Sequence, residues 1–203
     1  MNDAAAVKRG RRQLLALAAL FFVPLGVAFF LYYGPTGWRP GGDTHLGDLL
    51  DPARPLPALA LPQPDGSVTS PEWLRGKWTL LYVGDGQCDD RCRAALYLTR
   101  QTRIALNKDI DRVQRVFLVT GGCCDRAYLA GEHPDLVVAL VDTGAAAVLL
   151  GPFPAYDGVP VASAGRIYLV DPLGNLLMSY SDAAPDKALL TDLKKLLGLS
   201  HIG

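Results

Sequence analysis

The hydrophobic positions of the chain first form one continuous run and later fall into short strand-like and helix-like patterns. Residues 14–33 contain no charged side chain, and a helix of that length matches the roughly 30 Å hydrocarbon layer of a bilayer. Basic side chains at 8, 9, 11 and 12 precede the run. By the positive-inside rule, this predicts a cytoplasmic tail at 1–13, a transmembrane helix at 14–33, and the rest of the chain on the far side of the membrane.

Two other targeting segments are compatible with parts of this N-terminus. A cleaved signal peptide has a shorter apolar core followed by small residues, whereas this run ends in Phe-Phe-Leu-Tyr-Tyr. Arg11-Arg12 also resembles a twin-arginine signal. Positive charge that sets the topology explains the same two arginines, so we favour the single-pass anchor.

The chain beyond the anchor divides into a spacer and a domain. Residues 34–64 are rich in Pro and Gly, which is typical of a semi-extended linker, and we expect at most a short strand near 59–61. A domain follows at 65–203. Its apolar runs predict strands at 78–84, 113–120 and 136–141, and a hairpin formed by 166–170 and 175–180 around Pro172-Leu173-Gly174.

Two helices complete the predicted domain. Residues 88–107 place Cys92, Ala95, Leu96 and Thr99 on one side. A last helix carries an apolar stripe, with Pro185 expected in its first turn and Gly198 as its stop; the stripe consists of Leu189, Leu190, Leu193, Leu196 and Leu197. The order of elements predicts an α/β layered domain. Because cysteines directly follow the first buried strand, we expect a thioredoxin-like fold.

Composition narrows the class of protein. Half of the residues are hydrophobic, and 20 Lys+Arg balance 20 Asp+Glu. This composition excludes a disordered chain and argues against a nucleic-acid-binding protein, which would carry a concentrated basic excess. Three His make an all-imidazole metal centre improbable, while four Cys are enough for one redox or metal site.

Cys88 and Cys92 stand at the predicted junction between a strand and a helix. Free N–H groups and the helix dipole stabilise a thiolate there, and a spacing of four residues brings the two sulfurs together. Such a pair can exchange disulfides or hold Cu(I). An ordinary structural disulfide is the alternative, although so small a loop adds little stability. Arg91 favours thiolates, while neighbouring aspartates oppose them.

These residues carry a family resemblance. The stretch at 76–84 (GKWTLLYVG) followed by Cys88-Asp89-Asp90-Arg91-Cys92, together with 168–174 (YLVDPLG), resembles the SCO/SenC family. Members of that family are membrane-anchored, thioredoxin-like proteins that deliver copper to the binuclear copper site of cytochrome c oxidase or reduce its cysteines. The resemblance implies Cys88 as the exposed attacking thiol or first Cu(I) ligand, and Cys92 as resolving thiol or second ligand. It also implies oxidase subunit II or another assembly factor as partner.

The sequence departs from the family at one ligand. The family's copper-binding His lies five residues before the hairpin Tyr, which here is Tyr168, and Ser163 occupies that position. His133 lies beside Pro134, where we expect a surface role. Met178 could assist two thiolates, but we favour a core position in the hairpin for it. Three-coordinate copper of the family type is therefore not expected. A proline that related redoxins carry before the late strand is also missing, with Gly165 in its place.

Cys123 and Cys124 form a second cysteine pair. They follow the strand at 113–120, which we expect to end at the same sheet edge as the strand before Cys88. Thiol–disulfide exchange between the two pairs is then chemically reasonable. We do not expect the adjacent residues to bond to each other, because such a disulfide is strained. Burial of one of them as a small apolar group is the alternative.

The sequence thus predicts an extracytoplasmic factor, tethered to a bacterial inner membrane, for assembly of an oxidase copper site. It would act by thiol–disulfide exchange, Cu(I) handling or both, through Cys88 and Cys92, with Cys123 and Cys124 as possible second thiols. Two alternatives remain: a non-catalytic assembly factor and a general periplasmic disulfide reductase.

Overall fold

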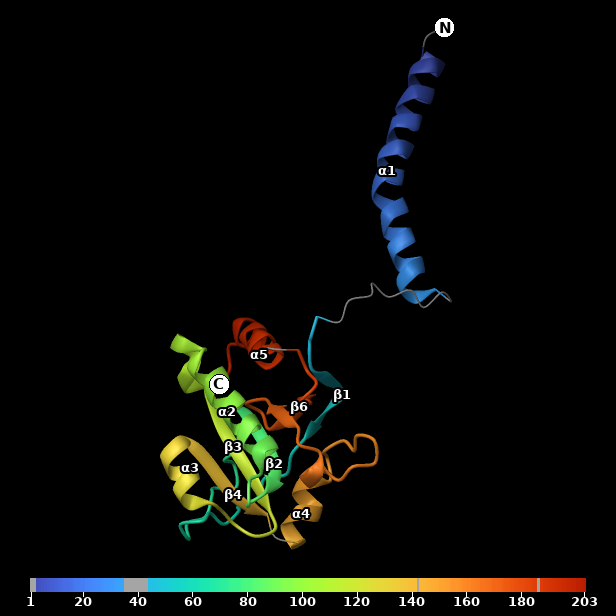
Figure 1. Ribbon diagram of the computed structural model, residues 1–203. Coiled ribbons are helices and arrows are strands. Elements are labelled where there is room, and N and C mark those ends of the chain that lie inside the picture. Colours follow the sequence, from blue (N-terminus) through green and yellow to red (C-terminus); the bar gives the residue numbers. More distant parts are fainter. Residues whose placement is uncertain (1–2, 35–43, 142, 186) are drawn as a thin grey trace. The chain divides into compact units, whose positions relative to one another are not determined.

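The apolar run near the N-terminus forms one long helix. The computed structural model describes residues 3–34, 44–141, 143–185 and 187–203 (Figure 1). The chain divides into two units, 1–44 and 45–203. In the first, α1 (Asp3–Tyr33) contains Pro24 and includes the predicted 14–33. Its part from Val7 to Tyr33 is long and apolar enough to cross a membrane, which agrees with the predicted anchor.

The second unit is built on one mixed sheet. In the described part of the chain its strands are β1 (Asp48–Pro55), β2 (Trp78–Asp85), β3 (Val113–Thr120), β4 (Leu136–Val141), β5 (Ile167–Val170) and β6 (Asn175–Tyr180). The spatial order is β1-β6-β5-β2-β3-β4. Strands β2, β3 and β4 are parallel, while β5, β6 and β1 continue the sheet with antiparallel pairing. The predicted strands and hairpin are confirmed within one or two residues.

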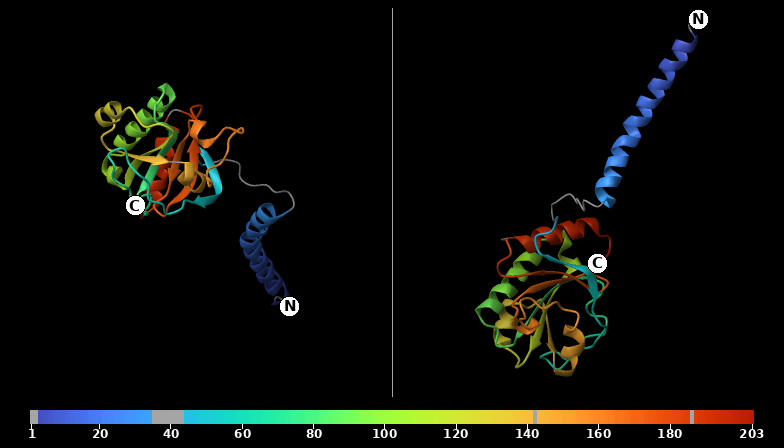
Figure 2. Two further views of the ribbon diagram at one scale, coloured as in Figure 1. Left: turned by 90° about the horizontal axis from the view of Figure 1, so that it is seen from below. Right: turned by 90° about the vertical axis from the view of Figure 1, so that its right-hand side faces the viewer.

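Helices cover both faces of this sheet (Figure 2). The first core cluster packs one face of the sheet against α2 (Asp90–Ile104), α3 (Arg126–Glu132) and α5 (Ala188–Leu199). Its buried residues include Phe117 of β3, Leu96 of α2, Leu129 of α3 and Leu193 of α5. The second core cluster packs the other face against α4 (Thr143–Leu150) and the segment before β2, and its buried residues include Leu118 of β3, Leu149 of α4, Leu61 and Leu74. Leu80 and Tyr82 of β2 belong to the first cluster, and Leu81 and Val83 belong to the second. The strand is therefore buried on both faces, as its apolar sequence predicts.

The predicted spacer at 34–64 is wrong over its second half. Residues 35–43 lie outside the described residues, but β1 pairs with β6, and Leu56 and Leu61 are buried in the second core cluster. No strand forms at 59–61 in the described chain. The prolines of β1 are tolerated because an edge strand leaves one row of N–H positions unpaired. Proline content alone therefore does not distinguish this edge strand from a linker.

Both predicted helices differ from the observed ones at their ends. The first ends at Ile104, and a separate 3₁₀ helix, η1 (Asn107–Arg112), follows. Asn107 has φ of 52°, a left-handed conformation that does not continue an α-helix. The last helix starts at Ala188 and ends at Leu199. Pro185 therefore precedes it, and Gly198 lies inside its last turn.

Candidate redox site

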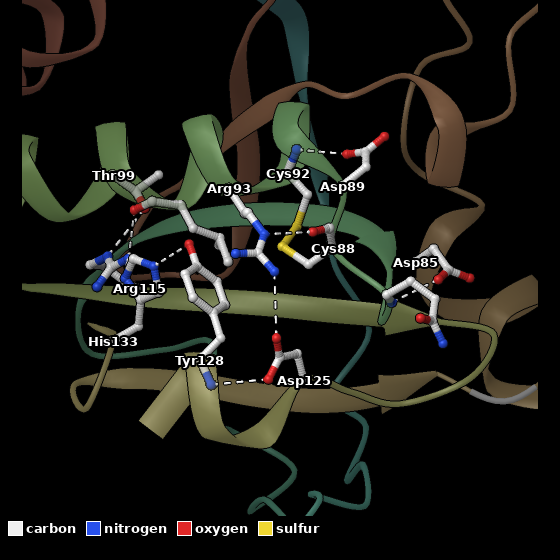
Figure 3. Close-up of a disulfide and its surroundings, with 12 residues drawn as sticks. Asp85, Cys88, Asp89, Cys92, Arg93, Thr99, Arg115, Asp125, Tyr128 and His133 are labelled. Carbon is white, nitrogen blue, oxygen red and sulfur yellow. Dashed lines mark hydrogen bonds and ion pairs between the residues drawn. A yellow bond between two sulfur atoms is a disulfide. The ribbon is translucent and has the colours of Figure 1, made fainter. Parts of the chain in front are cut away.

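Cys88 and Cys92 are joined in a disulfide at the start of α2 (Figure 3). The backbone N–H of Cys88 donates to the carbonyl of Asp85 at 3.1 Å, which closes a tight turn directly after β2. The side chain of Asp89 caps the helix by accepting from the N–H of Cys92 at 2.9 Å. The strand end and the helix cap together fix the spacing of the two cysteines.

The disulfide is buried, although it lines a pocket. Cys88 and Cys92 are only 2% and 3% exposed, so the expectation that Cys88 presents an exposed thiol is wrong for this state of the chain. Packing of both residues into the first core cluster explains the burial. The pocket has a volume of about 380 Å³, and Tyr82, Asp85 and Ser163 contribute to its walls. Burial raises the pKa of the Tyr82 hydroxyl, and the charge of Asp89 adds to that effect.

Ser163 lies in the short 3₁₀ helix η2 (Val161–Ser163) and lines the same pocket as the two cysteines. Arg91 holds this segment against the start of α2 by donating to the carbonyl of Ala164 at 3.1 Å. Arg91 also pairs with Asp182 at 3.2 Å. Gly165 follows with φ of 62°, and a Cβ there would overlap the Arg91 guanidinium. The position that the resemblance assigns to the family's His thus borders the disulfide but carries a hydroxyl.

The donor set does not fit three-coordinate copper. Within the described ranges no group of three or more His, Cys, Asp or Glu side chains could hold a metal ion. Met178 is buried in the first core cluster and accepts a hydrogen bond from the hydroxyl of Tyr180, so it has the expected core role. Two cysteine sulfurs remain as the soft ligands available beside this pocket.

A polar chain that the sequence did not reveal connects the disulfide loop to α3 (Figure 3). Arg93 donates to the carbonyl of Cys88 at 3.2 Å and pairs with Asp125 at 3.4 Å. Its guanidinium also lies 4.4 Å from the ring centroid of Tyr128. The Tyr128 hydroxyl lies 3.0 Å from Nε2 of His133. Arg93 is therefore a bridge between the first cysteine and the start of α3.

The chain continues from His133 to Arg115, whose side chain is fully buried. The Arg115 guanidinium lies 3.2 Å from Nδ1 of His133 and donates to the carbonyl of Leu96 at 2.7 Å and to Asp135 at 2.9 Å. A guanidinium can only donate, so Nδ1 accepts and Nε2 carries the proton. Burial, and next the charge of Arg115, lower the pKa of His133.

The expected surface role of His133 is therefore wrong, since the residue is only 3% exposed. It is buried because its two ring nitrogens are satisfied by Tyr128 and Arg115, which removes the cost of taking a polar ring out of water. A signal existed in the strand at 113–120: Arg115 is the one charged residue in a mostly apolar strand, and such a residue needs buried partners.

Cys123 and Cys124 lie in the loop between β3 and α3 and are also joined in a disulfide. The expectation that they do not bond to each other is thus contradicted. They lie in irregular backbone between two elements, so no extended strand directs the adjacent side chains to opposite sides. The expected common edge is confirmed, because Asp85 at the end of β2 is in register with Thr120 at the end of β3.

A mixed sheet with helices on both faces, and a Cys-x-x-x-Cys disulfide between its central strand β2 and the following helix, define a thioredoxin-like protein. The family model described as the transmembrane-like, thioredoxin-like, C-terminal domain matches residues 78–200. The chain belongs to this family, and α1 fits the membrane anchor that the description implies.

Solved structures with the same fold include Sco proteins. ScoI of Bradyrhizobium japonicum, with copper bound, is 24% identical at a TM-score of 0.54, covering 70% of this chain and 98% of its own. Apo Sco1 of Thermus thermophilus is 23% identical, with a TM-score of 0.59, and the match covers 77% of this chain and 99% of the Sco1 chain. The thioredoxin domain of a thiol-disulfide oxidoreductase from Bacteroides vulgatus is 18% identical, with a TM-score of 0.52, and the match covers 70% of this chain and 94% of that domain. No curated protein matches the sequence.

Proposed function

We propose that this chain is a membrane-tethered, extracytoplasmic thiol–disulfide exchange factor for assembly of the copper site of a cytochrome c oxidase. The observation that carries the proposal is the Cys88–Cys92 disulfide at the N-terminus of α2, beside a pocket. The Sco structures, one of them with copper bound, support the assignment to copper-site assembly. The basic residues before α1 support an N-terminus in the cytoplasm of a bacterial cell and a domain in the periplasm.

The exchange step needs only the two cysteines and a disulfide on the partner, such as oxidase subunit II or another assembly factor. In the reduced chain, the Cys88 thiolate attacks one sulfur of the target disulfide, and the other target sulfur leaves as a thiolate. Cys92 then attacks Cys88 in the mixed disulfide. This releases the second target thiolate and forms Cys88–Cys92, so two electrons pass from this chain to the target.

Copper would be a cargo of this site. Two thiolates suit Cu(I), which soft sulfur ligands favour, and Cys88 and Cys92 are the residues that would hold it. Ser163 lines the pocket where the family's His would complete the ligand set. Its hydroxyl is a poor ligand for a soft ion, so we give thiol chemistry precedence over stable copper storage.

Exchange with a peptide carrying the two cysteines of an oxidase copper site tests this function. The reduced full-length chain in detergent is mixed with the oxidised peptide, and the reaction is followed by mass spectrometry. We expect Cys92→Ser to accumulate a mixed disulfide through Cys88, and Cys88→Ser to form no productive complex. Equal exchange by Cys88→Ser and the native chain would contradict the assigned roles.

A general disulfide reductase is a second candidate, favoured by the fold shared with the Bacteroides vulgatus oxidoreductase. The two functions differ in substrate range. An oxidase-assembly factor reduces the copper-site peptide much faster than unrelated disulfide peptides, whereas a general reductase treats them alike.

A further inference from the structure

The two disulfides of the domain differ in their access to solvent. Cys88 and Cys92 are only 2% and 3% exposed in the oxidised chain, and they line the pocket at which a target would meet them. Cys123 is exposed and Cys124 is half-buried. Cys124 packs against the first core cluster, which contains Cys88 and Cys92. The second pair therefore has one cysteine that is exposed to solvent and one that packs against the core cluster to which the first pair belongs.

Backbone contacts hold the two cysteine loops against each other. A Cβ placed on Gly86, two residues before Cys88, would overlap the carbonyl of Gly122 and come within 2.8 Å of the Cα of Cys123. A Cβ on Gly121 would come within 2.7 Å of an Asp85 carboxylate oxygen. Gly86 and Gly121 thus allow an approach that larger residues would prevent.

A side-chain contact joins the same loops. Arg93 donates to the carbonyl of Cys88 and pairs with Asp125, the residue that follows Cys124. Asp125 in turn caps α3 by accepting from the N–H of Tyr128 at 3.1 Å. Arg93 consequently connects the first cysteine of one pair to the neighbour of the last cysteine of the other.

From this arrangement we propose that Cys123–Cys124 is a second redox centre, which takes electrons from an external protein dithiol and passes them to the buried Cys88–Cys92 disulfide. The inference rests on the proposed function, because it supplies the reduced Cys88/Cys92 pair on which exchange with a target depends. It assigns a role to two cysteines that lie outside the Cys-x-x-x-Cys motif.

The transfer balances as two successive exchanges. A thiolate of the external dithiol attacks Cys123, and Cys124 leaves as a thiolate. The second external thiol then attacks the external sulfur bonded to Cys123. This step releases Cys123 in the reduced form and leaves the external pair oxidised. Cys124 then attacks one sulfur of Cys88–Cys92, and the other sulfur leaves and takes a proton. Cys123 attacks Cys124 in the mixed disulfide, which restores Cys123–Cys124 and frees the second sulfur. Two electrons and two protons have moved inward.

A kinetic experiment on the full-length chain in detergent tests the direction of transfer. The oxidised chain is mixed with reduced thioredoxin as the probe dithiol, quenched with acid, alkylated and digested with trypsin. Cleavage after Lys77, Arg91, Arg115 and Arg126 places Cys88 in one peptide and Cys123 with Cys124 in another, so alkylation of each peptide reports the state of its pair. We expect Cys123→Ser/Cys124→Ser to slow reduction of Cys88–Cys92 by about tenfold or more. The matched variant Cys88→Ser/Cys92→Ser should leave reduction of Cys123–Cys124 unchanged.

An unchanged rate of Cys88–Cys92 reduction in the Cys123→Ser/Cys124→Ser chain overturns the relay. A trapping experiment does not depend on rates. Cys123→Ser/Cys92→Ser leaves only Cys88 and Cys124, and Cys123→Ser/Cys88→Ser leaves only Cys92 and Cys124. Mild oxidation should form an intramolecular disulfide in at least one of these variants, each checked for native melting by circular dichroism. Absence of that disulfide in both also overturns the relay.

Neither experiment contains a target protein, so the relay and the proposed function can fail separately. Normal internal transfer without exchange on the copper-site peptide would contradict the function and leave the relay standing. The opposite result is also possible to observe. If a chemically reduced Cys123→Ser/Cys124→Ser chain exchanges normally with the copper-site peptide, and thioredoxin reduces its Cys88–Cys92 disulfide at the native rate, the relay is contradicted and the proposed function stands.

Discussion

Ser163 shows how one residue changes the chemistry of a pocket without changing its construction. It lines the pocket together with Cys88 and Cys92, and Arg91 holds the following residue against α2. The same wall could therefore present a ligand in place of a hydroxyl. What the native side chain lacks is an imidazole nitrogen, which suits copper ions far better than a hydroxyl does.

Ser163→His should accordingly raise the affinity of the reduced full-length chain for Cu(I) by about tenfold or more, which corresponds to about 1.4 kcal/mol or more of binding free energy. Competition titration against a Cu(I) chelator measures this change. Ser163→Ala is the matched control and should bind as the native chain does. If the His variant binds no more tightly than the Ala variant, position 163 is not a ligand position.

His133 makes the stability of the domain depend on pH. Its Nδ1 accepts from Arg115, so a proton on that nitrogen would face an existing donor, and burial adds to the cost of charge. Arg100 also opposes the charge, while Asp135 and Glu132 favour it, and the net effect lowers the pKa below the ordinary 6.5. The unfolded chain thus binds the proton more readily than the folded chain.

The contribution of His133 to stability is fully present above about pH 6.5 and is lost as the pH falls from there towards the lower pKa of the folded state. We expect the free energy of unfolding of the native chain to decrease between pH 7.5 and pH 5 by more than that of His133→Gln, which does not titrate. Urea denaturation at both pH values measures this difference. An equal or larger decrease in the Gln variant would contradict the lowered pKa of His133.

Among the elements, β1 shows what an edge strand contributes. Among the strands that the structure describes, it pairs with β6 alone, at the end of the sheet. Leu50 is 8% exposed and belongs to the second core cluster, whereas the adjacent Leu49 is 51% exposed. The strand is thus part of the folded domain, despite its two prolines, because Leu50 packs into the core and the backbone pairs with β6.

Leu50→Ala should lower the free energy of unfolding by about 2 kcal/mol, because it removes buried apolar surface and leaves a cavity. The matched variant Leu49→Ala, on the opposite face of the strand, should change it by less than about 0.5 kcal/mol. Chemical denaturation of both variants measures the two effects. Equal effects would indicate that residues 48–55 are a linker after all.

The elements that could be predicted from the sequence are those whose signal is local. The apolar strands from 78 to 180, the N-terminal helix and the position of Cys88 and Cys92 follow from hydrophobic runs and from one motif. The strand at 48–55 could not be recognised, because its pairing with β6 is a tertiary contact and its prolines mimic a linker. The Arg115–His133–Tyr128–Arg93 chain was missed for the same reason, since it joins β3, α3 and α2.

At the scale of the molecule, the topology brings its reactive groups to one place. Parallel pairing of β2 and β3 directs the loops after both strands to the same sheet edge, and each loop carries a cysteine pair. The η2 segment before β5 adds the wall that contains Ser163. Segments separated by up to about 75 residues thus surround one site, while α1, in the other unit, contains a stretch long and apolar enough to cross a membrane.

The central claim is that Cys88 and Cys92 carry out the chemistry of an oxidase-assembly factor, and cytochrome c oxidase activity in cells that lack this chain tests it most directly. The native gene should restore the activity of their membranes. The Cys88→Ser/Cys92→Ser chain, produced to the same level in the membrane, should leave it near the level of the deletion strain. Full restoration by the variant would contradict the account and would identify a non-catalytic assembly factor instead.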